Sequence, residues 1–135
     1  MSPDNTELLY ARYPSLFDHR HEAGGYRGIE CPDGWFAIVN GLCHQIVNHP
    51  QGHDLKVFQI KEKFGALRFY LDEGSLTNIE GLNEAYERAA NASVGTCEKC
   101  GEPGELMKIH RVMKTLCPNH EVQFRENPRA YNGYE

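Results

Sequence analysis

The chain lacks several features that would place it in a class at once. No apolar run approaches the roughly 18 residues of a membrane-spanning helix. The opening residues MSPDNTELLY carry neither the basic start nor the apolar stretch of a secretory signal. The motifs GxSxG, GxGxxG, HExxH and the P-loop do not occur, so hydrolase, dinucleotide-binding and NTPase interpretations have no motif support. We expect a cytoplasmic protein that is not bound to a membrane.

Composition sets further limits. The chain has 135 residues, 40% of them hydrophobic and 24% charged, which suits one globular domain, or one domain with a small appendage. Its five cysteines are too few for a disulfide-rich secreted scaffold. The net charge of −5 comes from residues 1–94, where 8 Lys and Arg face 13 Asp and Glu, while residues 95–135 hold 6 of each. This acidic balance disfavours broad adhesion to nucleic acid or to anionic membrane.

Residues 1–94 have the pattern of an α+β unit. Apolar residues recur at helical spacing from Trp35 to Val47, with Asp33 as the expected N-cap. The period then changes to two, which predicts two strands joined at Phe64 and Gly65. Further helices are expected over 6–13, ended by Pro14, and over 78–91, and a surface loop over 18–30. We therefore predict a small antiparallel hairpin or sheet packed with two main helices.

The most specific pattern lies in residues 95–135. Cys97 and Cys100 form a CxxC pair, and after sixteen intervening residues Cys117 and His120 form a CxxH pair. Three thiolates and one imidazole make a closed tetrahedral set suited to structural Zn²⁺. With a hairpin expected over 106–116 and a helix from 117, the segment is typical of a treble-clef or zinc-ribbon finger.

Other interpretations of the same cysteines are buried, unmetallated thiols and a redox CxxC, although no thioredoxin-like unit surrounds the motif. We predict an α+β core over 1–94 and a zinc-finger segment with a C-terminal tail over 95–135, packed as one unit. The last residues, 131–135, suit either a disordered or a docked tail.

Two nuclease interpretations have weaker support. Asp33, with Asp54 and Lys56, imitates the PD…DxK pattern of Mg²⁺-dependent nucleases, but a helix intervenes between the two parts. His110 sits where a treble-clef nuclease places its general base. A second metal site is a further alternative, although the histidine spacings favour surface or capping roles and Cys43 suits the core. Its candidate ligands are His19, His21, His44, His49, His53, Cys31 and Cys43.

The motifs also carry a resemblance. The segment QIKEKFGALRFY (59–70), the knuckle CEKCGEPG (97–104) and TLCPNH (115–120) resemble a group of small bacteriophage and prophage proteins without an established activity. The openings NTELL (5–9) and CPDGW (31–35) fit the same pattern, so the resemblance covers residues 5–120. It departs at the short connection 48–54. It implies phage origin and the zinc knuckle, and it supplies no catalytic residues.

Phage origin favours a non-catalytic binding protein that engages and inhibits a host protein of defence or nucleic-acid processing. A phage protein is the other partner class, and the sequence leaves the oligomeric state open. The alternative is a zinc finger that binds nucleic acid through Lys108, Arg111 and Lys114. The candidate partner-binding residues, chosen for expected exposure, are Glu62, Arg68, Tyr70, Lys108, Arg111 and Lys114.

Overall fold

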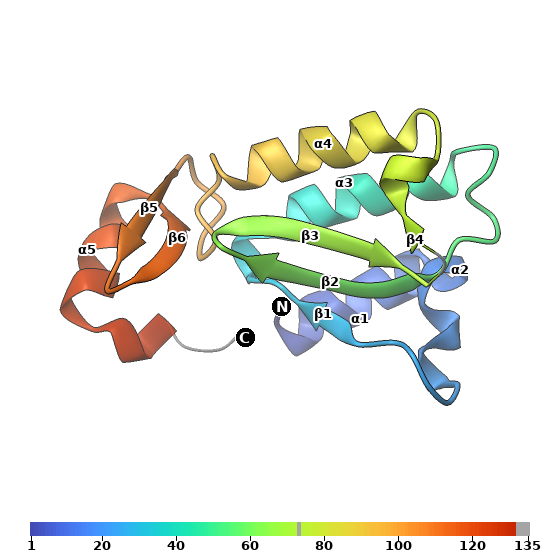
Figure 1. Cartoon of the computed structure of the whole chain (residues 1–135). Coiled ribbons are helices and arrows are strands. Elements are labelled where there is room, and N and C mark those ends of the chain that lie inside the picture. The colour runs from blue at the N-terminus through green and yellow to red at the C-terminus, as the bar shows by residue number, and fades with distance from the viewer. Residues whose placement is uncertain (73, 132–135) are drawn as a thin grey trace.

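The computed structural model describes residues 1–72 and 74–131, so the expected tail lies outside the described residues apart from Tyr131. The chain folds into helices and two small sheets, which confirms the α+β class (Figure 1). The elements are α1 (Pro3–Arg12), α2 (Pro14–Phe17), β1 (Gly28–Glu30), α3 (Phe36–Val47), β2 (Val57–Lys63), β3 (Ala66–Leu71), β4 (Gly74–Ser75), α4 (Leu82–Ser93), β5 (Glu105–Ile109), β6 (Val112–Leu116) and α5 (Pro118–Glu126).

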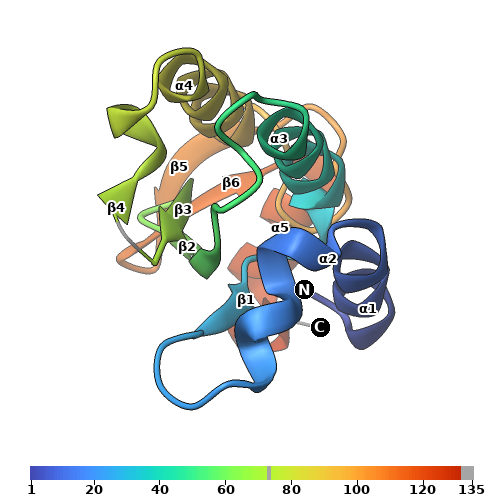
Figure 2. The ribbon, with the colours of Figure 1, turned by 90° about the vertical axis from the view of Figure 1, so that its right-hand side faces the viewer.

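The larger sheet has the strand order β1-β2-β3-β4. β1 runs parallel to β2, and the other pairs are antiparallel. Figure 2 shows α1, α2 and α3 on one side of this sheet, with α4 above it. Side chains alternate along β3, where Leu67 and Phe69 are buried while Arg68 and Tyr70 are half-buried on the opposite face. Helices therefore cover one face of the sheet.

The hairpin at Phe64 and Gly65 is confirmed. Both residues have positive φ, 55° and 80°, as a tight two-residue turn between twisted strands requires. Glycine adopts this conformation without a steric penalty, and Phe64 is held there with its ring 67% exposed. The tip of the β2–β3 hairpin thus presents an aromatic ring to solvent.

The expected helix cap at Asp33 is wrong. A 3₁₀ turn over Asp33–Trp35 delays the start of α3 to Phe36, which places Asp33 too early to cap it. Its Oδ1 instead accepts hydrogen bonds from the Ser2 N–H at 2.7 Å and from Nδ2 of Asn5 at 3.2 Å. Asp33 therefore ties the beginning of α1 to the beginning of α3.

Other boundaries also differ from expectation. The predicted loop over 18–30 contains a 3₁₀ turn at Asp18–His21 and ends in β1, because Ile29 is buried and its backbone pairs with β2. The first helix starts earlier, at Pro3, since Ser2 caps it, and Pro14 opens α2. α4 starts at Leu82, later than expected.

Two segments meet at one junction. We call residues 1–94 the core and residues 95–131 the finger; the boundary between them as domains stays a prediction. Trp35 is fully buried, and its indole N–H donates to the Thr96 carbonyl at 3.0 Å. The Gly34 N–H donates to the Glu98 carbonyl at 2.9 Å, and the Thr115 hydroxyl to the Gly65 carbonyl at 2.8 Å. Thus the finger packs against the entry to α3 and the tip of the β2–β3 hairpin.

Within the described residues, no helix is both long enough and apolar enough to cross a bilayer.

Candidate metal centre

The four predicted ligands come from two places in the finger. Cys97 and Cys100 lie in the turn before β5, where Gly101 has a φ of 82° and its N–H donates to the Cys97 carbonyl at 2.9 Å. Cys117 is the N-cap of α5, and its Sγ accepts a hydrogen bond from the His120 N–H at 3.5 Å. The β5–β6 hairpin brings these two turns together, as the sequence predicts.

Their ligand atoms all lie within 4.8 Å of one another. The Sγ atoms of Cys100 and Cys117 are 3.8 Å apart, and Nδ1 of His120 lies 3.5 Å from the Cys97 Sγ and 3.2 Å from the Cys117 Sγ. Around a tetrahedral ion with bonds of about 2.3 Å to sulfur and about 2.0 Å to nitrogen, two sulfur atoms are about 3.8 Å apart, and a sulfur and a nitrogen are about 3.5 Å apart. The group could therefore hold a metal ion.

The thiols differ in acidity. Burial and the neighbouring thiols raise the pKa of Cys100 to about 11. Burial would also raise the pKa of Cys117, but hydrogen bonds from the backbone N–H of His120 and from neighbouring thiols outweigh it, so that pKa lies below its usual value. Cys117, at the helix N-terminus, is therefore more ready than Cys100 to bind as thiolate. Metal binding would displace the proton of the Cys100 thiol, so affinity falls as the pH falls.

A buried ion pair stands behind the knuckle. Glu98 and Lys114 are 2% and 8% exposed, and Nζ of Lys114 lies 3.0 Å from Oε1 of Glu98. Burial raises the pKa of Glu98, although Lys114 pulls it down. The backbone of Glu98 also pairs with Thr115, since its N–H donates to that carbonyl at 2.9 Å. The residue between the first two ligands is thereby fixed to β6.

Sequence reasoning missed this pair. Glu98 was not singled out, and Lys114 was expected on the surface. The expected exposure of Lys114 is wrong, because its side chain runs inward to Glu98 and its ammonium lies 5.7 Å from the ring centre of Phe124. The alternation along β6 offered one signal, since Lys114 shares a strand face with the apolar Leu116, which is 1% exposed.

The other candidate partner-binding residues are dispersed. Glu62 is half-buried, and its carboxylate accepts the Gly65 N–H at 2.7 Å. Arg68 and Tyr70 lie on the sheet face that the helices leave open. Lys108 and Arg111 are exposed on the finger. The structure places them on both sides of the junction, and their role in binding stays a prediction.

The remaining histidines do not join a metal-capable group in the described part of the chain. His49 caps a turn: its Nδ1 accepts from the Gln51 N–H at 3.0 Å, and its Nε2 donates to the Glu80 carbonyl at 2.8 Å. Nε2 of His19 lies 2.7 Å from the Val57 carbonyl. Cys31 and Cys43 are buried in the core, and burial raises the pKa of both thiols, that of Cys31 to about 12.

The PD…DxK arrangement does not form, and the ring of His110 has partners of its own. Asp33 precedes α3 and Asp54 follows it, so the length of that helix, about 18 Å for twelve residues, lies between them. Nζ of Lys56 donates to the Ser15 carbonyl at 3.0 Å. Nε2 of His110 lies 3.2 Å from the Arg125 carbonyl, and its ring packs edge-on against Phe124. These side chains thus have structural partners.

Comparisons with family models, with curated proteins and with solved structures found no match to this chain.

Proposed function

We propose that this chain is a zinc-stabilised, non-catalytic binding protein of phage type, which engages a host protein in the host cytoplasm and inhibits it. The observation that carries the proposal is the exposed apolar pair at the junction of core and finger. Phe64 is 67% exposed at the tip of the β2–β3 hairpin, and Leu106 is 41% exposed on β5. The Leu106 side chain lies against Gly65, the residue next to Phe64 in the hairpin turn, and we treat the two exposed apolar residues as one patch.

Zinc is the metal that suits the site best. Three thiolates and one imidazole at tetrahedral spacing match its preferred donors, and four protein ligands leave no position open for substrate or water. The ion would be held by Cys97, Cys100, Cys117 and His120, and it would clamp the knuckle to α5. Its contribution is stability of the surface that the finger presents.

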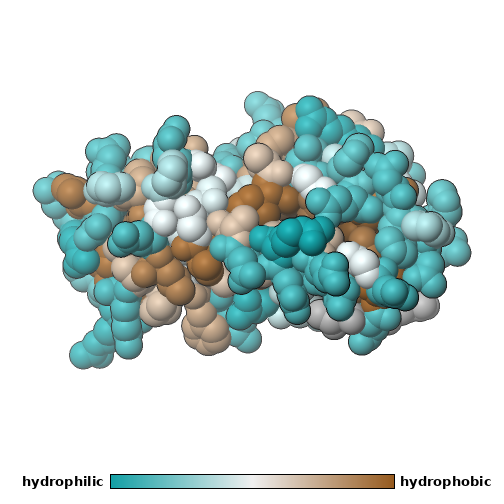
Figure 3. Space-filling view, turned by 90° about the horizontal axis from the view of Figure 1, so that it is seen from above, coloured by the Kyte–Doolittle hydropathy of each residue, from teal (hydrophilic) through white to brown (hydrophobic). Residues whose placement is uncertain are grey.

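The junction patch, Phe64 and Leu106, has the character of a binding site. Figure 3 shows brown hydrophobic atoms reaching the surface at the finger end of the molecule, bordered by teal. Lys63, whose ammonium lies 5.5 Å from the Phe64 ring centre, and the exposed Lys108 on β5 supply positive charge around it. An apolar centre with a basic border fits a protein partner that offers an apolar pocket edged by carboxylates. Inhibition would follow from occlusion of that pocket.

Affinity capture with matched variants tests the proposal. Tagged wild type, Phe64→Asp and Val122→Asp are compared on nuclease-treated host lysate. Val122 is 53% exposed on α5, so its variant places the same charge on another exposed apolar site. We expect one discrete protein to be retained by wild type and Val122→Asp and lost with Phe64→Asp. The interaction is then rebuilt from the two purified proteins. Capture that all three share equally, or no direct binding between the purified pair, would contradict the proposal.

The alternative in which the finger binds nucleic acid loses part of its basis. Of its three cations, Lys114 is committed to Glu98 inside the finger, which leaves Lys108 and Arg111. Two exposed cations make a small electrostatic contribution in a protein of net charge −5.

A further inference from the structure

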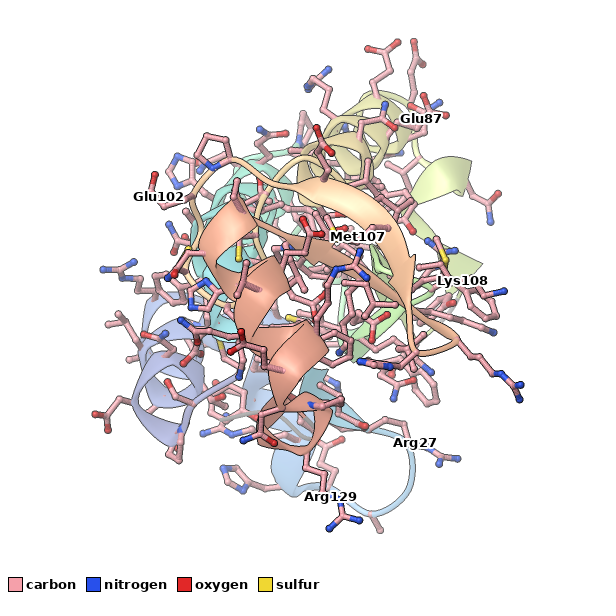
Figure 4. The ribbon with its side chains drawn as sticks, turned by 90° about the vertical axis from the view of Figure 1, so that its left-hand side faces the viewer. Arg27, Glu87, Glu102, Met107, Lys108 and Arg129 are labelled. Carbon is pink, nitrogen blue, oxygen red and sulfur yellow. The ribbon has the colours of Figure 1, made fainter. Side chains whose placement is uncertain are left out.

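The open face of the larger sheet carries a concentration of positive charge. Register and alternation place Lys61, Lys63 and Arg68 on this face with Tyr70, pointing away from the helices. The side chain of Arg27 joins them just before β1, where its guanidinium lies 5.7 Å from the ring centre of Phe58. In Figure 4, seen from the finger end, Arg27 and Lys108 both extend on the side where the strands of this sheet lie.

Two of these cations are held directly opposite each other. Lys61 on β2 is the register partner of Arg68 on β3. Like charges in this position destabilise a sheet. On the other side of Lys61 lies Glu30 of β1, whose Oε1 accepts the Gln59 amide at 3.1 Å. Among the described residues, the carboxylates of Glu30 and of Asp72, at the end of the face, stand against the four cations. The face therefore keeps an excess of positive charge on a chain that is negative as a whole, which suits a polyanion.

A hollow of about 360 Å³ opens at the end of the same face. Two aromatic residues, Phe58 and Tyr70, line it together with Gln59, Leu71 and Asp72. Gln59 and Tyr70 are register partners on β2 and β3, so the hollow lies one alternation step from the Lys61–Arg68 pair. Rings beside a row of cations are the arrangement on which unpaired bases stack while their phosphates are neutralised.

We infer that this face binds single-stranded nucleic acid, with a base in the aromatic hollow and the backbone along Lys61, Arg68 and Lys63. A duplex keeps its bases stacked on one another and offers no ring face to Phe58 or Tyr70. The site goes beyond the proposed function, because it lies on the open sheet face and does not use Phe64 or Leu106. The net negative charge of the protein weakens the binding, and the neutralisation of phosphates by lysine and arginine makes it sensitive to salt.

The test is fluorescence anisotropy with the full-length, zinc-loaded protein. The probes are a labelled single strand of DNA of about 15 nucleotides, its RNA equivalent and the same sequence as a duplex. With about three phosphates neutralised, affinity for the single strand should fall about 20-fold between roughly 50 and 200 mM salt. Lys61→Glu should weaken binding at least tenfold. Arg88→Glu, the same charge change at an exposed site on α4, should weaken it no more than about twofold.

Lys61→Glu also separates binding from folding, because it turns the like-charge pair with Arg68 into an opposite-charge pair and the opposite-charge pair with Glu30 into a like-charge pair. The two changes offset each other, so the variant should melt close to the wild-type temperature while it binds less. Tyr70→Ala should weaken binding several-fold, and Tyr70→Phe, which keeps the ring, should restore most of it. The same titrations on Phe64→Ser, which removes the ring without adding a charge beside Lys63, should match wild type, so failure of the proposed protein partner and failure of this site give different results.

Three results would overturn the inference. One is the absence of binding to either single strand at the lower salt concentration. Another is equal affinity for the duplex, or for an acidic peptide of the same length, since charge alone would then explain binding. The third is equal loss of affinity in Lys61→Glu and Arg88→Glu, which would place no site on the sheet face.

Discussion

The core and the finger are stabilised by different means. The buried cluster of the core has at least 21 members, which come from the helices and the sheet and include Trp35, Phe17 and Phe69. The buried cluster of the finger has five described members, and two of them, Cys97 and Cys117, are candidate metal ligands. Apolar burial at about 25 cal/mol per Å² can hold the first segment, whereas so few apolar side chains cannot hold the second. We therefore expect the finger to depend on metal coordination and on its contacts with the core.

Removal of the metal should have the largest effect. Structural zinc supplies about 10 kcal/mol or more of folding free energy in small fingers, so chelation should unfold residues 95–131 and leave the core folded. Two-dimensional NMR of the labelled protein, with zinc added back afterwards, measures this directly. An unchanged spectrum of the finger after complete chelation, or far less than one equivalent of zinc in protein purified without chelator, would refute it.

The junction offers the next largest effect. A Cβ at Gly34 would overlap the backbone carbonyls of Cys97 and Glu98, so Gly34→Ala should cost about 3 kcal/mol and separate the finger from the core. Gly41 lies within α3 with nothing near its Cβ position, and Gly41→Ala should stabilise by about 0.5–1 kcal/mol. Urea unfolding of both variants makes the comparison. Equal stability of the two would show that the junction is not tightly packed.

Loss of the buried ion pair comes third. Lys114→Met leaves the carboxylate of Glu98 buried without its charge partner and should cost about 3 kcal/mol. Lys108→Met, on the exposed face of the same hairpin, should change the free energy of unfolding by less than about 0.5 kcal/mol. Adding Glu98→Gln to Lys114→Met should recover part of the loss. If the two lysine variants unfold alike, the pair contributes nothing to the finger.

The cysteines of the core and those of the finger should differ in how fast they react with a thiol reagent. This comparison measures the exposure of the thiols and not the free energy of unfolding. Cys31 and Cys43 are 0% exposed, and burial raises the pKa of both thiols, so they should resist a thiol reagent in the native protein. The three finger cysteines should be slow with zinc bound and fast after chelation. A timed thiol titration should therefore show three groups on chelation and two more on denaturation. Early reaction of all five would mean that the core opens with the finger.

The predictable features were those set by neighbouring residues. The CxxC and CxxH pairs predicted that the four side chains cluster, because a spacing of two residues turns both side chains of a pair toward one point. The β2–β3 hairpin followed from the alternation around Phe64 and Gly65. The apolar stripe of α3 likewise predicted which of its residues, such as Val39 and Ile46, would be buried. These patterns reflect local geometry, so the packing of the rest of the chain does not change what they predict.

Features that depend on distant residues were not predictable. The neighbouring sequence favours Asp33 as a helix cap, but its carboxylate instead accepts hydrogen bonds from Ser2 and Asn5. β1 is too short to show a strand pattern in the sequence. It forms because its backbone pairs in parallel with β2. Which residues lie opposite each other on the open sheet face depends on the register between β2 and β3.

The sequence by itself determined the Cys and His cluster that could hold a metal ion, the α+β class and the elements with strong periodicity, because spacing along the chain decides which side chains share a face or a turn. The tertiary structure alone decided that Lys114 turns inward to Glu98, that Gly34 is in contact with the knuckle and that Lys61 stands opposite Arg68. Burial and charge pairing between segments that are far apart in the sequence depend on the packing of the whole chain. The pattern of neighbouring residues does not show that packing.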